Sequence, residues 1–174
     1  MSKGTHSSGF GSLVSGAMTA AAVAVQTGLA AVVGVVLARE FGRSPETDGF
    51  FSAYVVFIVV VLAAGAIRVT VLPAFARARE AGMLGGEVVA YGLVLGSVAA
   101  PLLVVTVIAA SPLATALTGE PSGLAQTTAA AALPWMMLAA VCQLFAGLAA
   151  SALAALDDYG TSALGFAGGS VAGL

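Results

Sequence analysis

Four long stretches of this chain contain no charged residue, and that absence limits the possible folds more than any other feature. They are Gly4–Ala38, Gly49–Ile67, Val88–Gly119 and Pro121–Leu156. Because an α-helix rises about 1.5 Å per residue, about 20 apolar residues cross a hydrocarbon core roughly 30 Å thick. Each stretch therefore holds at least one crossing. The sequence predicts an all-α, polytopic transmembrane helical bundle.

The composition excludes several classes of protein. Hydrophobic residues make up 60% of the chain and charged residues 8%, and the mean hydropathy is +1.06, which excludes a soluble fold and any large domain outside the membrane. No basic run resembles a nucleic-acid footprint, so nucleic acid is not an expected partner. The single cysteine, Cys142, cannot form an internal disulfide. His6 has no second metal ligand near it, and no nucleophile lies beside a base, so we expect no metal, no cofactor and no enzymatic activity.

The apolar runs and their polar flanks set the expected helix boundaries. Residues 1–12 are interpreted as a flexible cytoplasmic tail, and residues 13–174 as the transmembrane region. We expect about four complete helices at residues 13–38, 49–72, 88–110 and 130–156, and an incomplete fifth at 161–174. Thr47 or Asp48 is available to cap the second of these helices. Since the last run has no polar flank, we expect the chain to be a fragment, an early stop or a shortened form of a longer protein.

The basic residues of the short loops predict the orientation. If the N-terminus is cytoplasmic, four basic residues lie inside and two lie outside. The inner set is Lys3, Arg68, Arg77 and Arg79, and the outer set is Arg39 and Arg43. The positive-inside rule therefore favours a cytoplasmic N-terminus.

Three polar residues inside the apolar helices are candidates for substrate binding. Arg68 either contacts an anion near the cytoplasmic mouth of a transport cavity or extends its guanidinium to the membrane surface. Gln26 and Thr27, in the middle of the first helix, either line a hydrophilic path or hydrogen-bond to a neighbouring helix. Trp135, beside Pro134, is interpreted as an interfacial anchor.

Three stretches of the chain resemble the MurJ/MviN family. The first joins Ala38-Arg39-Glu40-Phe41-Gly42 to Thr47-Asp48-Gly49-Phe50-Phe51, where the family typically has Ala-Arg-x-Phe-Gly and Thr-Asp-Ala-Phe-Phe. The second is Gly65–Pro73, which is similar to the family's Gly-Ala-Phe-x-x-Ala-Phe-x-Pro. The third begins at Leu133-Pro134-Trp135 and ends at Asp157-Asp158-Tyr159-Gly160. Together the stretches extend over nearly the whole chain.

The resemblance implies both a fold and a function. MurJ/MviN proteins are lipid II flippases of the multidrug/oligosaccharidyl-lipid/polysaccharide exporter superfamily, with fourteen helices and cytoplasmic termini. This chain would correspond to the first four helices and part of the fifth. It would reside in the bacterial inner membrane, contact membrane lipids and a lipid-linked glycan precursor of the cell wall, and join other membrane chains that complete the fold.

Two alternatives remain open. The family's cavity arginines align here near Thr27, Val33, Val59 and Val60, none of which carries a charge. This difference favours a truncated homologue without transport activity, or a membrane interaction partner. A drug/cation antiporter of the same superfamily would need a carboxylate within the first helices, and none is present there.

Overall fold

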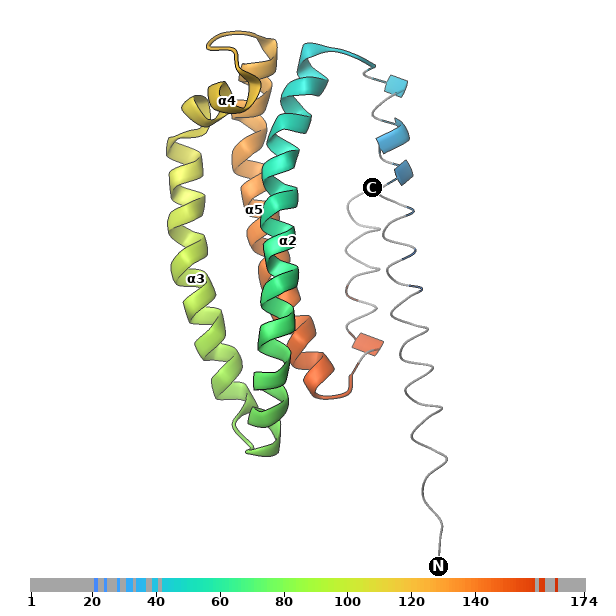
Figure 1. Ribbon diagram of the computed structural model, residues 1–174, viewed down its shortest axis with the longest axis vertical. Coiled ribbons are helices and arrows are strands. Elements are labelled where there is room, and N and C mark those ends of the chain that lie inside the picture. The colour runs from blue at the N-terminus through green and yellow to red at the C-terminus, as the bar shows by residue number, and fades with distance from the viewer. Residues whose placement is uncertain are drawn as a thin grey trace, which may run out of the picture.

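The described part of the chain is all-α, with short connections between its helices. The computed structural model in Figure 1 describes residues 42–158, together with residues 21, 24, 28, 31, 32, 34–36, 39, 40, 160, 161 and 165, and excludes the side chains of Ala64 and Arg68. The helices bounded there are α2 (Pro45–Glu80), α3 (Leu84–Ile108), α4 (Ala110–Thr118) and α5 (Leu124–Ala155). Helices α2, α3 and α5 are long and apolar enough to cross a membrane. The all-α prediction is confirmed for this part, whereas most of residues 13–38 and 161–174 lie outside it.

Helix α2 begins earlier than predicted, and neither Thr47 nor Asp48 is its cap. Ser44 has an extended backbone, and its side-chain oxygen accepts a hydrogen bond from the Thr47 amide at 3.3 Å. Pro45 occupies the first helical position, where its missing N–H costs nothing and its fixed φ suits a helix. The Ser-Pro pair therefore starts α2 four residues before the predicted boundary at Gly49.

Helix α2 also ends later than predicted, because Pro73 does not stop it. The helix continues from the predicted end at Leu72 to Glu80. A proline inside a helix removes one backbone hydrogen bond, and its φ remains helical. Gly82, with φ +71°, completes the cap that follows the end of the helix at Glu80. The Met83 amide donates to the Ala78 carbonyl at 2.8 Å and the Gly82 amide to the Arg79 carbonyl at 3.0 Å, a Schellman motif.

A short helix occupies part of the connection predicted after residue 110. Helix α3 begins at Leu84, remains one helix through Pro101 and ends at Ile108. The backbone of Ala109 leaves the helical region, and α4 then runs to Thr118. Pro112 is in the first turn of α4, where a proline is tolerated. Gly119, with φ +73°, terminates this helix.

Helices α2 and α5 run parallel, and α3 lies against them in the opposite direction (Figure 1). The Cα of Gly49 lies against the Ala125 carbonyl at one end of the pair. At the other end, an Arg79 nitrogen donates to the Ala155 carbonyl at 2.7 Å. The two contacts join α2 to α5 near both ends of the pair. Helix α4 lies at the end of the bundle where α2 and α5 begin.

The interior consists of two small clusters, one near each end of the bundle. Ala53, Ala114, Ala129 and Leu133 form the first cluster. Val71, Phe75, Leu148 and Ala155 form the second, to which Tyr91 and Leu95 of α3 are added. In the most apolar 18 residues of each helix, 28% of the residues are buried in α5, but only 6% are buried in α2 and 6% in α3. Helix α5 is thus the central element of the described bundle.

The outer faces of α2 and α3 are strongly apolar. Large side chains that are more than half exposed include Val59, Leu62, Val69, Leu93, Val98 and Ile108. Leaving such side chains in water costs about 25 cal/mol for each Å² of apolar surface, whereas lipid tails accept them without this cost. Helix length and surface together indicate a multi-pass membrane protein.

Candidate functional site

Arg68 is the candidate site residue whose backbone the structure describes. It lies within α2, twelve residues before the helix ends at Glu80. Its position on α2 is nine residues from Arg77, the next charged residue along the helix, which corresponds to about 13 Å along the axis. The helix does not end one turn after Arg68, as the predicted boundary at Leu72 implied.

The other two candidates, Gln26 and Thr27, lie outside the described residues. Their assignment as substrate-binding residues therefore stays a prediction.

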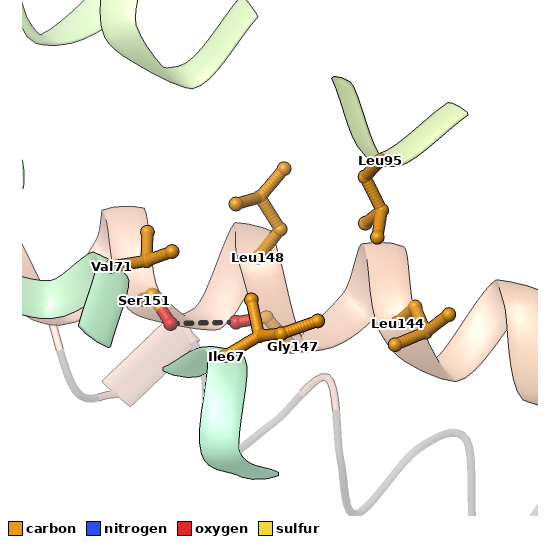
Figure 2. Close-up of a pocket in the computed structure, with 7 residues that line it drawn as sticks. All are labelled: Ile67, Val71, Leu95, Leu144, Gly147, Leu148 and Ser151. Atoms are coloured by element: carbon orange, nitrogen blue, oxygen red, sulfur yellow. Dashed lines mark hydrogen bonds between the residues drawn. The ribbon is translucent and has the colours of Figure 1, made fainter. Parts of the chain in front are cut away.

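A small gap lies between α2, α3 and α5. Its volume is about 10 Å³, room for no more than about one water molecule, and it is lined by Ile67, Val71, Leu95, Leu144, Gly147, Leu148 and Ser151. Figure 2 shows these side chains converging from the three helices. The lining is apolar except for Ser151, whose hydroxyl donates to the Gly147 carbonyl at 2.8 Å within α5. The gap is too small for a ligand, and its hydroxyl is already hydrogen-bonded within α5.

Two glutamines of α5, Gln126 and Gln143, lie inside a charge-free run. They are not among the residues predicted to bind substrate. Gln126 is buried, and its amide donates to the Ser111 hydroxyl at 3.0 Å and the Ser111 carbonyl at 3.3 Å. It thereby ties α4 to the start of α5. Gln143, near the middle of α5, is half-buried. The side-chain hydrogen bonds of α5 between described residues involve Gln126, Thr127 and Ser151, but not Gln143. The sequence signal that could have identified Gln126 and Gln143 is an amide side chain within a run that holds no charged residue.

One group of charged residues lies where α2 and α5 end. Arg79 forms an ion pair with Asp157 at 2.6 Å, and both side chains are largely exposed. Arg77 is exposed as well, and its Nε donates to the Pro73 carbonyl at 3.2 Å. Such pairs at the surface contribute little to stability, about 1 kcal/mol or less. They mark the water-facing end of the bundle rather than a reactive centre.

Asp158 closes the turn that follows α5. Its carboxylate accepts hydrogen bonds from the Thr161 amide at 3.1 Å and the Thr161 hydroxyl at 2.8 Å. These two bonds stabilise the ionised form, and the amide contributes more, so the pKa of Asp158 lies below its ordinary value. The carboxylate thus serves the local turn.

The described residues offer no group of side chains for metal binding. Within that part of the chain, no three side chains of His, Cys, Asp or Glu come together in a way that holds a metal ion. Arg68 on α2 and Gln143 on α5 are polar residues within apolar helices.

Comparison of this chain with protein-family models, with curated proteins and with solved structures finds no match. The functional assignment therefore rests on the residues themselves and on the geometry described above.

Proposed function

We propose that this chain is a MurJ/MviN-like membrane protein that acts as a flippase, or as part of one, for a lipid-linked cell-envelope glycan precursor. It would act in the bacterial inner membrane, with its N-terminus cytoplasmic, during peptidoglycan or related cell-wall synthesis. The observation that carries the proposal is the resemblance of residues 38–51, 65–73 and 133–160 to this family. The three apolar helices of membrane-spanning length are compatible with it.

Arg68 is the residue that we assign to the substrate in this proposal. A charge at membrane depth is costly, and where it occurs it generally faces a cavity or pairs with another group. A guanidinium also suits phosphate oxygens, because its donors form a rigid fork. Lipid-linked glycan precursors carry phosphate between the lipid and the sugar, so an arginine within an apolar helix fits this class of substrate.

A specific observation also favours a second function, that of a non-transporting membrane partner. Of the positions that align with the family's cavity arginines, Val59 is 61% exposed on the apolar surface of α2 and Val60 is half-buried. Neither side chain can bind an anion. A homologue without these arginines would keep the helical scaffold and contact other membrane chains instead. The antiporter alternative has less support, because the charge-free run of α2 holds no carboxylate.

The two functions differ in what happens to a fluorescent lipid-linked glycan in native membranes. We expect inverted vesicles from cells that make the chain to translocate the fluorescent glycan faster than vesicles from cells that lack the chain. Arg68→Gln should abolish the difference at unchanged protein abundance. Arg77→Gln, which removes an exposed charge from the same helix, should preserve it. Equal translocation with and without the chain would contradict the flippase and favour the partner role.

A further inference from the structure

Helix α4 begins where the membrane crossing made by α3 is complete. The residues of α3 that follow Glu87 are uncharged as far as the end of the helix at Ile108, and their length of about 30 Å matches the hydrocarbon core. The charge-free run continues through α4 to Gly119. The nine residues of α4 are too few for a crossing of their own. Helix α4 therefore lies at the level where the hydrocarbon of one leaflet ends.

The packing of Ala114 indicates the same level from the other helices. Ala114 belongs to the buried cluster that contains Ala53 of α2 and Ala129 of α5, and α4 lies beside the early turns of both helices (Figure 1). Ala53 follows Asp48, a charged residue of the first turn of α2, by about 7 Å along the helix axis. Helices that lie in a membrane interface are buried about 5–10 Å below the headgroup boundary, so the two depths agree.

The outer face of α4 is apolar. It consists of Pro112, Leu113, Ala116 and Leu117, all of which are exposed. Leu113 and Leu117 are one turn apart, so their side chains are neighbours on one side of the helix. The face follows directly in the chain on Val105 and Ile108, which are exposed on the apolar surface of α3.

The hydroxyl groups of α4, in contrast, are bonded within the protein. The Ser111 hydroxyl accepts a hydrogen bond from the buried Gln126 amide at 3.0 Å. The half-buried Thr115 and Thr118 donate to the carbonyls of Ser111 and Ala114 at 3.1 and 2.9 Å. A helix at a surface in contact with water turns its apolar side chains inward and its polar ones outward. The reverse arrangement in α4 indicates that its outer face is surrounded by an apolar medium.

We propose that α4 is an interfacial helix whose outer face is embedded in the lipid of one leaflet, at the boundary between acyl chains and headgroups. The leaflet is the one at the end of the bundle opposite Arg79 and Asp157. The partner of this face is the lipid surface itself, because burial among acyl chains removes the exposed leucines from water. The connection between α3 and α5 then leaves the membrane only after Gly119. This inference does not depend on the proposed substrate.

The test measures the accessibility of a nitroxide spin label on the full chain reconstituted in phosphatidylcholine vesicles. In a Cys142→Ala background, Leu113→Cys and Leu117→Cys each carry one label, which is exposed to oxygen, concentrated in lipid, or to a nickel chelate, confined to water. We expect oxygen to relax the label several-fold more strongly than the chelate at both positions. Val98→Cys, on the exposed face of α3, is the lipid control, and Ser122→Cys, in the connection after α4, is the aqueous control.

Two results would overturn the proposal. If the chelate relaxes the α4 labels as strongly as the label at position 122, the outer face lies in water. If both reagents act weakly on the α4 labels while oxygen acts on the label at position 98, a protein surface, such as a second copy of this chain, covers the face. Circular dichroism verifies the fold of each labelled variant. Both leucines are exposed and are tested separately, so either position alone decides between these outcomes.

Discussion

At Gly49 the backbone of α2 lies directly against that of α5. A methyl group added there would overlap the carbonyl oxygen of Ala125, which belongs to the backbone and cannot move aside. We expect Gly49→Ala to destabilise the bundle by about 1–3 kcal/mol, the usual cost of overpacking. The measurement is unfolding of the purified chain in mixed detergent micelles.

Gly65 of the same helix provides the matched control. No described atom lies within 4 Å of a methyl group added at this position. We therefore expect Gly65→Ala to leave stability unchanged or to raise it slightly, because alanine favours helix more than glycine does. Equal losses in the two variants would show that the Gly49 contact has no special role.

Asp157 adopts a left-handed backbone without being glycine. Its φ is +62°, and it ends α5 through the same motif that Gly82 completes after α2. Asp157→Asn removes the ion pair to Arg79 but tolerates this conformation, so we expect a loss below about 1 kcal/mol. Asp157→Val should lose about 1–2 kcal/mol more, because a branched side chain clashes at positive φ. Unfolding in detergent compares the two variants, and similar losses would contradict the role of the backbone.

At the scale of elements, Asp158 connects α5 to the turn that follows it. Its pKa is lowered by the Thr161 amide and hydroxyl. A carboxyl whose pKa is depressed in the folded state stabilises that state above the pKa of the unfolded chain, and the contribution disappears as pH falls through the folded pKa. We therefore expect the turn to loosen only in acid, below the ordinary pKa of aspartate.

Carbon-detected NMR titration of the Asp158 carboxyl checks this expectation. Thr161→Ala should raise its pKa part of the way to the ordinary value, since the hydroxyl bond is lost and the amide bond remains. Thr127→Ala, which removes a hydroxyl near the other end of the bundle, should not move it. A pKa of Asp158 insensitive to Thr161→Ala would argue against the hydroxyl contact.

The helices themselves follow from sequence to different degrees. The existence of α2, α3 and α5 was predictable, because uncharged apolar runs of this length favour membrane helices. Their ends were less predictable. Pro73 looked like a terminator but lies within α2, since neighbouring residues extend the helix past it. Helix α4 was missed, because its nine residues are too few to give a distinct apolar pattern.

For the whole molecule, the parallel pair and antiparallel α3 predict which loops share a side of the membrane. Ala81, between α2 and α3, lies at the same end as Asp157, and Ser122, between α4 and α5, lies at the opposite end. In a Cys142→Ala background, we expect an impermeant maleimide applied to intact cells to label Ser122→Cys but not Ala81→Cys. After permeabilisation both should react. The reverse pattern would contradict a cytoplasmic N-terminus, and labelling of both in intact cells would contradict the arrangement of spans.

The sequence by itself determined the class of this protein: an all-helical chain with several spans, because charge-free runs cannot remain in water and must satisfy their backbone groups internally in lipid. It also determined which residues were unusual, Arg68 among them. The tertiary structure alone decided which residues of different helices lie side by side. This depends on the register between α2, α3 and α5, and that register is set by contacts such as Gly49 with Ala125 and Phe75 with Tyr91. Such contacts join residues far apart in the chain, so no local pattern specifies them.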